Sequence, residues 1–154
     1  MSLITKLRTQ KNKKRVNIYL DGKFALGLSL DGIIKEGLFV GQKLTEQQVE
    51  KLFFSHKLER LYNKTLNFLS YRPRSEKEIK DYSRKNLSTL PAIACQVERK
   101  IQSKILKKLK KLKLINDFDF ASWWLNQRLN FKARGKRRLR AEFIQKGISK
   151  EIID

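Results

Sequence analysis

The sequence predicts a mainly α-helical protein in which tandem three-helix units form an elongated body, preceded by a small antiparallel β head. Apolar and polar residues alternate within the first thirty residues, which is the pattern of half-buried strands. From Thr45 onward, apolar residues recur with the period of an amphipathic helix. A plan of helix, basic loop and helix also occurs twice. We therefore expect a β head at residues 1–44 and a helical repeat body at residues 45–154.

The β head is indicated by two alternating runs joined by a tight-turn sequence. The apolar positions are Val16, Ile18 and Leu20 in one run and Phe24, Leu26 and Leu28 in the next. Asp21-Gly22 lies between the runs and favours a hairpin turn in which both central residues have positive φ. Three antiparallel strands are expected within residues 3–28. Residues 30–36 favour a helical turn closed by Gly37.

Start and stop signals divide the helical body. Thr45 is a favourable N-cap for the first helix, and Pro73 ends that helix because the residue before proline avoids the α region. Ser75 begins the next helix. Either Asn116 or Asp117 caps a later one. Between the helix that begins at Ser75 and this later helix, a long amphipathic helix is predicted by apolar residues at Val97, Ile101, Ile105, Leu109 and Leu112.

The same local pattern occurs in both halves of the body. Ser75 is followed four residues later by Ile79, and Gly135 is followed four residues later by Leu139. A basic loop precedes each of these helix starts, and Gly147 ends the second helix. We expect two three-helix units, each too small to bury its apolar face alone. They are called the first repeat and the second repeat below.

Net charge is the strongest indication of function in the composition. The chain has 36 Lys and Arg against 15 Asp and Glu, which gives a formal charge of +21. An excess of this size is too large to be mostly paired within the fold, so it projects a positive field that attracts polyanions. An anionic partner is therefore expected, with a role in solubility alone as the alternative.

No catalytic residue and no metal site are expected. His56 has no acid or nucleophile beside it in the sequence to orient it as a base. Asp117 and Asp119 could form a metal pair, but helix capping and interaction with the helix dipole explain them more simply. The seven glycines are scattered and form no phosphate-binding loop. We expect a protein that is not an enzyme and has no cofactor.

Cysteine usage and hydropathy indicate a cytoplasmic protein. The single cysteine, Cys95, excludes an internal disulfide and suits a reducing compartment. No segment approaches the roughly 20 apolar residues of a membrane span, and the N-terminus lacks the apolar run of a signal peptide. A monomer without membrane contact is expected.

Two basic clusters are candidates for a binding surface. Residues 99–113 place lysines around a leucine stripe, which is equally typical of an exposed helix face and of a binding face. Residues 128–140 are richer in arginine, and cations at a helix start oppose its dipole, so binding explains them better than stability. The run Arg134–Arg138 is expected to be exposed. The predicted partner- or DNA-binding residues are Arg72, Arg74, Arg128, Lys132, Arg134, Lys136, Arg137, Arg138 and Arg140.

Trp123 and Trp124 are adjacent, so their side chains point about 100° apart on a helix. We expect one of them to lie in the core. The other is expected at a contact between units or at a partner interface.

Several stretches resemble the signatures of the RecX family, and their order and spacing are more specific than any one motif. The matches to the first helical unit are Leu66–Ile79, Leu114–Asp117 and Phe120-Ala121. The matches to the second unit are Gly135–Arg140 and Lys146–Ile148. In the β head, Tyr19–Phe24 resembles an N-terminal extension found in part of the family.

The resemblance implies a regulator of the bacterial recombinase RecA. RecX proteins bind along the groove of the RecA filament on DNA and limit its extension and activity, so the RecA filament and DNA are the implied partners. The resemblance also implies a third helical unit, which we expect to be missing here, leaving the body incomplete at its C-terminus. Ser83 stands where the family usually has an apolar residue, which predicts weaker packing of its helix.

Two other functions are compatible with the residues. A direct, non-sequence-specific nucleic-acid-binding module would use the same basic faces on phosphate groups. Such a module would bind bare DNA as tightly as RecA-coated DNA. A nucleic-acid-processing enzyme would need an acidic or histidine cluster that we do not find in the sequence.

Overall fold

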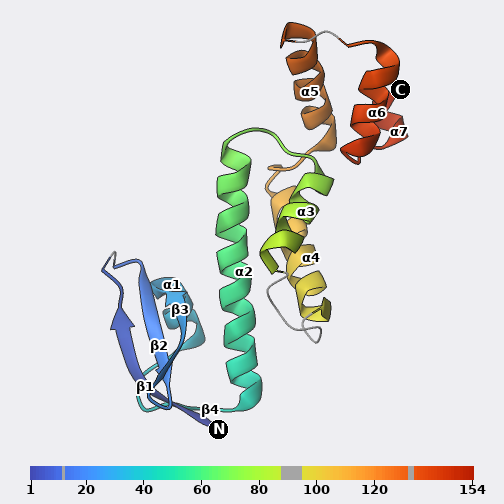
Figure 1. The fold of residues 1–154 in the computed structure, drawn as a ribbon. Coiled ribbons are helices and arrows are strands. Elements are labelled where there is room, and N and C mark those ends of the chain that lie inside the picture. The colour runs from blue at the N-terminus through green and yellow to red at the C-terminus, as the bar shows by residue number, and fades with distance from the viewer. Residues whose placement is uncertain (12, 88–94, 132–133) are drawn as a thin grey trace. The chain divides into compact units, whose positions relative to one another are not determined.

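The computed structural model describes residues 1–11, 13–87, 95–131 and 134–154 (Figure 1). The chain forms two compact units, which we call the N-terminal unit (Met1–Glu59) and the C-terminal unit (Arg60–Asp154). Helix α2, Glu46–Ser70, begins in the first of these and ends in the second.

The N-terminal unit contains a four-stranded antiparallel sheet. Its strands are β1 (Ser2–Thr9), β2 (Arg15–Leu20), β3 (Lys23–Ser29) and β4 (Lys43–Leu44), in the spatial order β3-β2-β1-β4. Asp21 and Gly22 join β2 to β3 with φ angles of 49° and 80°. Both angles are positive, as a hairpin turn of this kind requires. The predicted strands and their turn are confirmed.

One face of the sheet carries the core of this unit. Ile4, Ile18, Leu26 and Leu28 are buried there together with Leu38, Leu44 and Leu52. The alternation in the sequence predicts the burial of Ile18, Leu26 and Leu28. The same alternation puts Phe24 on this face, but Phe24 is 59% exposed, because a β-bulge at Ala25 shifts the register of β3. Leu52 belongs to α2, so the N-terminal unit extends past residue 44, where the change of periodicity begins.

In the N-terminal unit, helix α1 ends and helix α2 begins at the expected residues. Helix α1, Leu30–Glu36, ends at Gly37 with a left-handed φ of 60°. Thr45 caps α2, because its Oγ accepts a hydrogen bond from Gln48 N while Gln48 Oε1 accepts one from Thr45 N. This reciprocal pair satisfies two donors that the helix start leaves open.

The described part of the C-terminal unit is helical. It contains the end of α2, then α3 (Glu76–Leu87), α4 (Cys95–Lys111), α5 (Asp117–Phe131), α6 (Lys136–Gln145) and α7 (Lys150–Ile153). The predicted fold class, a mainly helical chain preceded by an antiparallel sheet, is confirmed. Gly135 precedes α6 with extended backbone, and Gly147 follows it with a φ of 77°.

The apolar stripe on α4 is buried only in its middle. Ile101, Ile105 and Leu109 are almost completely enclosed, whereas Val97 and Leu112 are 36% and 52% exposed. The prediction that the stripe runs to Leu112 is therefore wrong. Leu112 is exposed because α4 ends at Lys111 and Lys113 has a left-handed φ of 54°, which turns the chain away from the helix axis.

A second apolar cluster forms the core of the second repeat. Its buried residues are Phe120, Ala121, Phe143 and Ile148. Trp123, Trp124, Ile152 and Ile153 are half-buried and pack against it. One tryptophan was expected in the core and the other at a contact, but the structure places both, half-buried, against this cluster.

Ser83 on α3 is fully buried, and its hydroxyl has no hydrogen-bond partner among the described residues. An unpaired buried polar group costs about 1–3 kcal/mol. We therefore expect Ser83→Ala to raise the free energy of unfolding by about 1 kcal/mol, which is a rise in Tm of about 2–4 °C for a chain of this size. Thermal unfolding followed by circular dichroism measures this change.

Ser75→Ala is the matched contrast, since Ser75 is also fully buried. Its Oγ accepts a hydrogen bond from Glu78 N at 3.2 Å and donates one to Lys146 O at 2.8 Å. Loss of this cap and its second bond is expected to lower the free energy of unfolding by about 1–2 kcal/mol. A Ser83→Ala protein that melts below the wild type would contradict the prediction for Ser83.

Candidate anion-binding site

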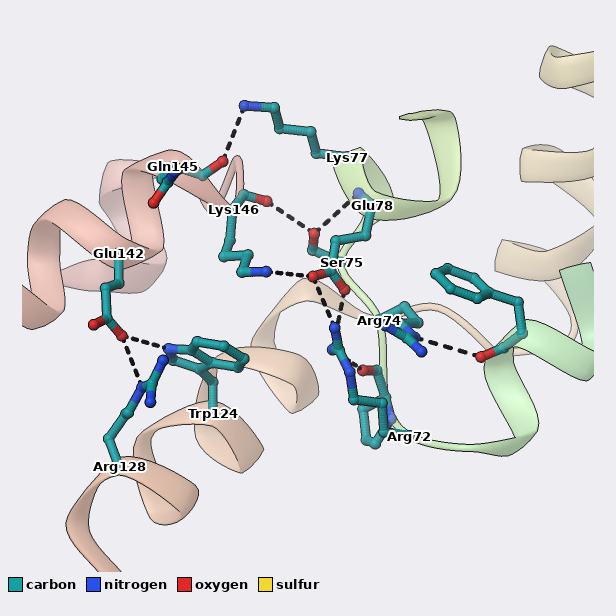
Figure 2. A network of polar contacts seen from close by, with 12 residues as sticks. Arg72, Arg74, Ser75, Lys77, Glu78, Trp124, Arg128, Glu142, Gln145 and Lys146 are labelled. Atoms are coloured by element: carbon teal, nitrogen blue, oxygen red, sulfur yellow. Dashed lines mark hydrogen bonds and ion pairs between the residues drawn. The ribbon is translucent and has the colours of Figure 1, made fainter. Parts of the chain in front are cut away.

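Side chains at the start of α3 contact the corner between α6 and α7 (Figure 2). Ser75 Oγ donates to Lys146 O at 2.8 Å, and Lys77 Nζ donates to Gln145 O at 2.9 Å. Gly147 completes this corner, where its backbone approaches the Lys77 side chain closely. We call this set of contacts the inter-repeat joint, because it connects the first repeat to the second.

Carboxylates strengthen the joint on both sides. Glu78 accepts two hydrogen bonds from Arg72, at 3.0 and 3.1 Å, and one from Lys146 at 2.6 Å. Asp117 Oδ1 accepts a hydrogen bond from the backbone N–H of Glu76, 41 residues away, at 2.9 Å. Asp117 therefore caps α3. Asn116 caps α5, since its Oδ1 accepts from Phe118 N at 3.0 Å.

Glu142 on α6 accepts hydrogen bonds from three donors of the second repeat, two of which, Trp124 and Arg128, are seen in Figure 2. Trp124 Nε1 and Arg128 Nε donate to one carboxylate oxygen at 3.0 and 2.9 Å, and Arg134 donates to the other. The Glu142 side chain is only 13% exposed. A bidentate acceptor of this kind fixes the α5 and α6 side chains in one arrangement.

A depression of about 480 Å³ lies over this cluster. Its lining residues are Trp124, Arg128, Arg134, Arg138, Ala141, Glu142, Gln145 and Lys146. Four of these carry a positive charge and one carries a negative charge, so the depression is cationic. The guanidinium of Arg128 lies 4.5 Å from the centre of the Trp124 ring, and Lys146 Nζ lies 4.9 Å from it. These cation–π contacts hold two of the four cations in place.

Four of the predicted binding residues are half-buried and already have partners within the chain. Arg72 pairs with Glu78, while Arg128 and Arg134 pair with Glu142. Arg74 donates to the backbone oxygen of Phe68 at 3.4 Å and stacks on its ring. The prediction that Arg134 is exposed is wrong, because its side chain is 21% exposed and lies against Glu142. Whether these four residues bind a partner stays a prediction.

The remaining predicted residues are more accessible. Lys136, Arg137 and Arg138 are exposed, and the structure shows no ion pair for them with any described residue. Arg140 is exposed and pairs with Asp154 at 2.7 Å. Lys132 lies outside the described residues. Arg138 is therefore the accessible predicted residue that also lines the depression.

Glu142 was not singled out from the sequence, although a signal was present. It is the single acidic residue between Phe120 and Lys150, within a stretch that is rich in cations. A lone carboxylate in such surroundings is available to several arginines at once. The sequence does not say which of them it holds.

The pKa values of Glu142, Glu78 and Glu76 lie below the usual value for a glutamate, so these three carboxylates stay ionised at neutral pH. Burial raises the pKa of Glu142, but hydrogen bonds from Trp124 and Arg128 outweigh it and leave the pKa below its usual value. Burial likewise raises the pKa of Glu78, and hydrogen bonds from Arg72 and Lys146 lower it to a net decrease. Hydrogen bonds from Lys110 and Lys80 lower the pKa of Glu76.

Other kinds of site are not found in the described part of the chain. No group of three or more His, Cys, Asp or Glu side chains is arranged to hold a metal ion within these residues. No helix within them is long and apolar enough to cross a membrane.

Comparison with known proteins relates this architecture to one family. The family models named "Regulatory protein RecX N-terminal domain", "RecX, first three-helix domain" and "RecX, second three-helix domain" match residues 2–45, 62–84 and 116–154. A crystal structure of regulatory protein RecX is 30% identical, with a TM-score of 0.73, and the match covers 100% of this chain and 71% of that one. The chain belongs to the RecX family. The two three-helix domains of RecX correspond to the first and second repeats.

Curated RecX relatives are longer than this chain. Regulatory protein RecX of Listeria monocytogenes serovar 1/2a is 36% identical over 144 residues, covering 94% of this chain and 50% of the relative. Regulatory protein RecX of Bacillus pumilus is 34% identical over 155 residues, covering 100% of this chain and 56% of the relative. The chain thus spans about half the length of the curated RecX proteins it matches.

Proposed function

We propose that this RecX chain regulates RecA by binding the RecA filament on DNA and limiting its extension and activity. It acts as a cytoplasmic monomer, by binding and without catalysis or a cofactor. Membership in a family of regulatory proteins supports a regulatory role. The observation that carries the proposal for the binding surface is the cationic depression with the exposed Arg138 at its wall.

The geometry of the second repeat suits binding to an anionic assembly. Glu142 holds Arg128 and Arg134 in fixed positions, so the depression is organised before a partner arrives. Lys136, Arg137 and Arg138 remain exposed on α6 beside it. Guanidinium groups in such a setting bind phosphate or carboxylate oxygens through paired hydrogen bonds. The field of the whole chain, at +21, brings it to the DNA-bound filament.

The test is the ATPase and strand-exchange activity of RecA on single-stranded DNA, measured over a series of RecX-chain concentrations. Both activities should fall at amounts well below one chain per RecA, because one bound chain that spans adjacent subunits or blocks a growing end affects many subunits. The chain alone should hydrolyse no ATP. Unchanged RecA activity at saturating chain, together with tight binding to bare DNA, would contradict the proposal.

The second candidate is a direct, non-sequence-specific nucleic-acid-binding module. The formal charge of +21 favours it, since that field attracts phosphate without any protein partner. Co-sedimentation with bare DNA and with RecA-coated DNA separates the two functions. Equal affinities for both would favour this module, and tighter binding to RecA-coated DNA would favour the RecA regulator.

A further inference from the structure

The outer face of the sheet in the β head, opposite its core, carries a row of three side chains across three strands. Val16 and Ile18 of β2 point into the core, so Tyr19 points to the outer face. Lys6 of β1 pairs with Tyr19, which in turn pairs with Phe24 of β3. Directly paired residues project from the same side of a sheet. Lys6, Tyr19 and Phe24 therefore form one row.

Two β-bulges lie on either side of Tyr19. The register of β1 against β2 shifts between Ile4 and Lys6, which leaves Thr5 as the extra residue. The register of β2 against β3 shifts beside Tyr19, which leaves Ala25 as the extra residue. Bulges redirect side chains and are frequent next to functional sites. Here they determine how Lys6 and Phe24 are presented beside Tyr19.

Phe24 offers an accessible aromatic surface in this row. Its side chain is 59% exposed, and its ring meets Tyr19 edge to face with centroids 5.9 Å apart. The edge-to-face contact occupies one part of the Phe24 ring and fixes its orientation. An oriented aromatic ring on a strand is the kind of surface on which unpaired nucleic-acid bases stack.

The charge of these strands complements a polyanion. β1, β2 and β3 contain no Asp or Glu, but they contain Lys6, Arg8, Arg15 and Lys23. Lys6 and Arg8 are both exposed, and Arg8 pairs with Asn17, the next outward residue of β2. The face therefore combines an accessible ring on β3 with two cations on β1, and β2 lies between these two strands.

We propose that the outer face of the β head is a binding site for single-stranded nucleic acid. A base stacks on Phe24, and backbone phosphates contact Lys6 and Arg8. The nucleic acid must be single-stranded, because the faces of the bases in a duplex are covered by the neighbouring bases. This site goes beyond the RecA-regulating function proposed above, since it requires no RecA.

The test measures binding of the full chain to a fluorescent dT15 oligonucleotide by anisotropy, without RecA. Phe24→Ala should weaken binding about tenfold, since loss of one stacked base commonly costs 1–3 kcal/mol. Phe24→Trp should restore binding at least to the wild-type level, because it keeps a stacking surface. Lys6→Gln combined with Arg8→Gln should also weaken binding.

Phe39→Ala is the matched control, because Phe39 belongs to the same unit and is 61% exposed against 59% for Phe24. It should bind dT15 within twofold of the wild type. Binding to a duplex of the same length should change less than twofold in Phe24→Ala. A Phe24→Ala protein that binds dT15 as the wild type does, or no worse than Phe39→Ala, overturns the proposal. Because RecA is absent, either result leaves the RecA-regulating function to its own test.

Discussion

Gly147→Ala is expected to destabilise the C-terminal unit by about 3 kcal/mol. Gly147 has a φ of 77°, and a side chain in this left-handed region costs roughly 1–2 kcal/mol. An added Cβ would also lie 2.7 Å from Lys77 Cβ and 2.8 Å from Lys77 Cδ. The first of these atoms is fixed to the α3 backbone, so relief of the overlap requires movement of the inter-repeat joint, at about another 1–3 kcal/mol.

Urea unfolding followed by tryptophan fluorescence measures this loss, because both tryptophans of the chain, Trp123 and Trp124, lie in the second repeat. Gly135→Ala is the matched control at the other end of α6. Gly135 has a φ of −61°, and nothing lies within 4 Å of an added Cβ. Replacing the glycine N-cap with alanine lowers the free energy of unfolding, and the smaller freedom of the unfolded chain raises it. The two effects nearly cancel, within about 0.5 kcal/mol. Equal stabilities of the two variants would show that the joint adapts to a side chain at Gly147.

The elements of the fold were predictable because their signals are local. The Asp21-Gly22 turn, the Thr45 cap and the glycine at position 147 each act within a few residues of the chain. The repeat was visible because the spacing from Ser75 to Ile79 recurs from Gly135 to Leu139. Periodicity alone did not reveal that the buried face of α4 ends before Leu112, since that depends on the left-handed Lys113.

The site was harder to predict because its contacts are long-range. Asp117 was one of two candidates to cap its own helix, but its carboxylate accepts a hydrogen bond from the N–H of Glu76 on α3. Arg134 belongs to a run of cations that was expected to be exposed, yet Glu142 holds it. A run of like charges shows that cations are in excess. Which of them lie near the few carboxylates depends on how helices pack, and this sequence does not contain that information in any local pattern.

The largest expected effect on binding comes from replacing Lys136, Arg137 and Arg138 together with Gln. These three residues are exposed, and no ion pair links them to another described residue, so the fold should tolerate the change. Removing one cation that binds a phosphate should make the slope of log affinity against log salt shallower by roughly 0.7–0.9. Removing all three cations should therefore make the slope shallower by about two to three. Binding to DNA-bound RecA at low salt should become at least about tenfold weaker. Arg134 is left unchanged, since its removal would disturb Glu142.

A second triple variant separates a local site from the general field. Lys100, Lys107 and Lys111 are exposed on α4, and replacing them with Gln removes the same three charges. Each triple variant lowers the formal charge of the chain from +21 to +18, so the attraction at long range falls equally in both. Binding measured from about 50 to 200 mM salt covers the range in which salt weakens binding to phosphate. A larger loss of affinity and a shallower slope for the α6 variant than for the α4 variant would place the binding surface at the exposed cations of α6, of which Arg138 lines the cationic depression. Equal slopes and affinities would mean that the residues on α6 contribute only their charge.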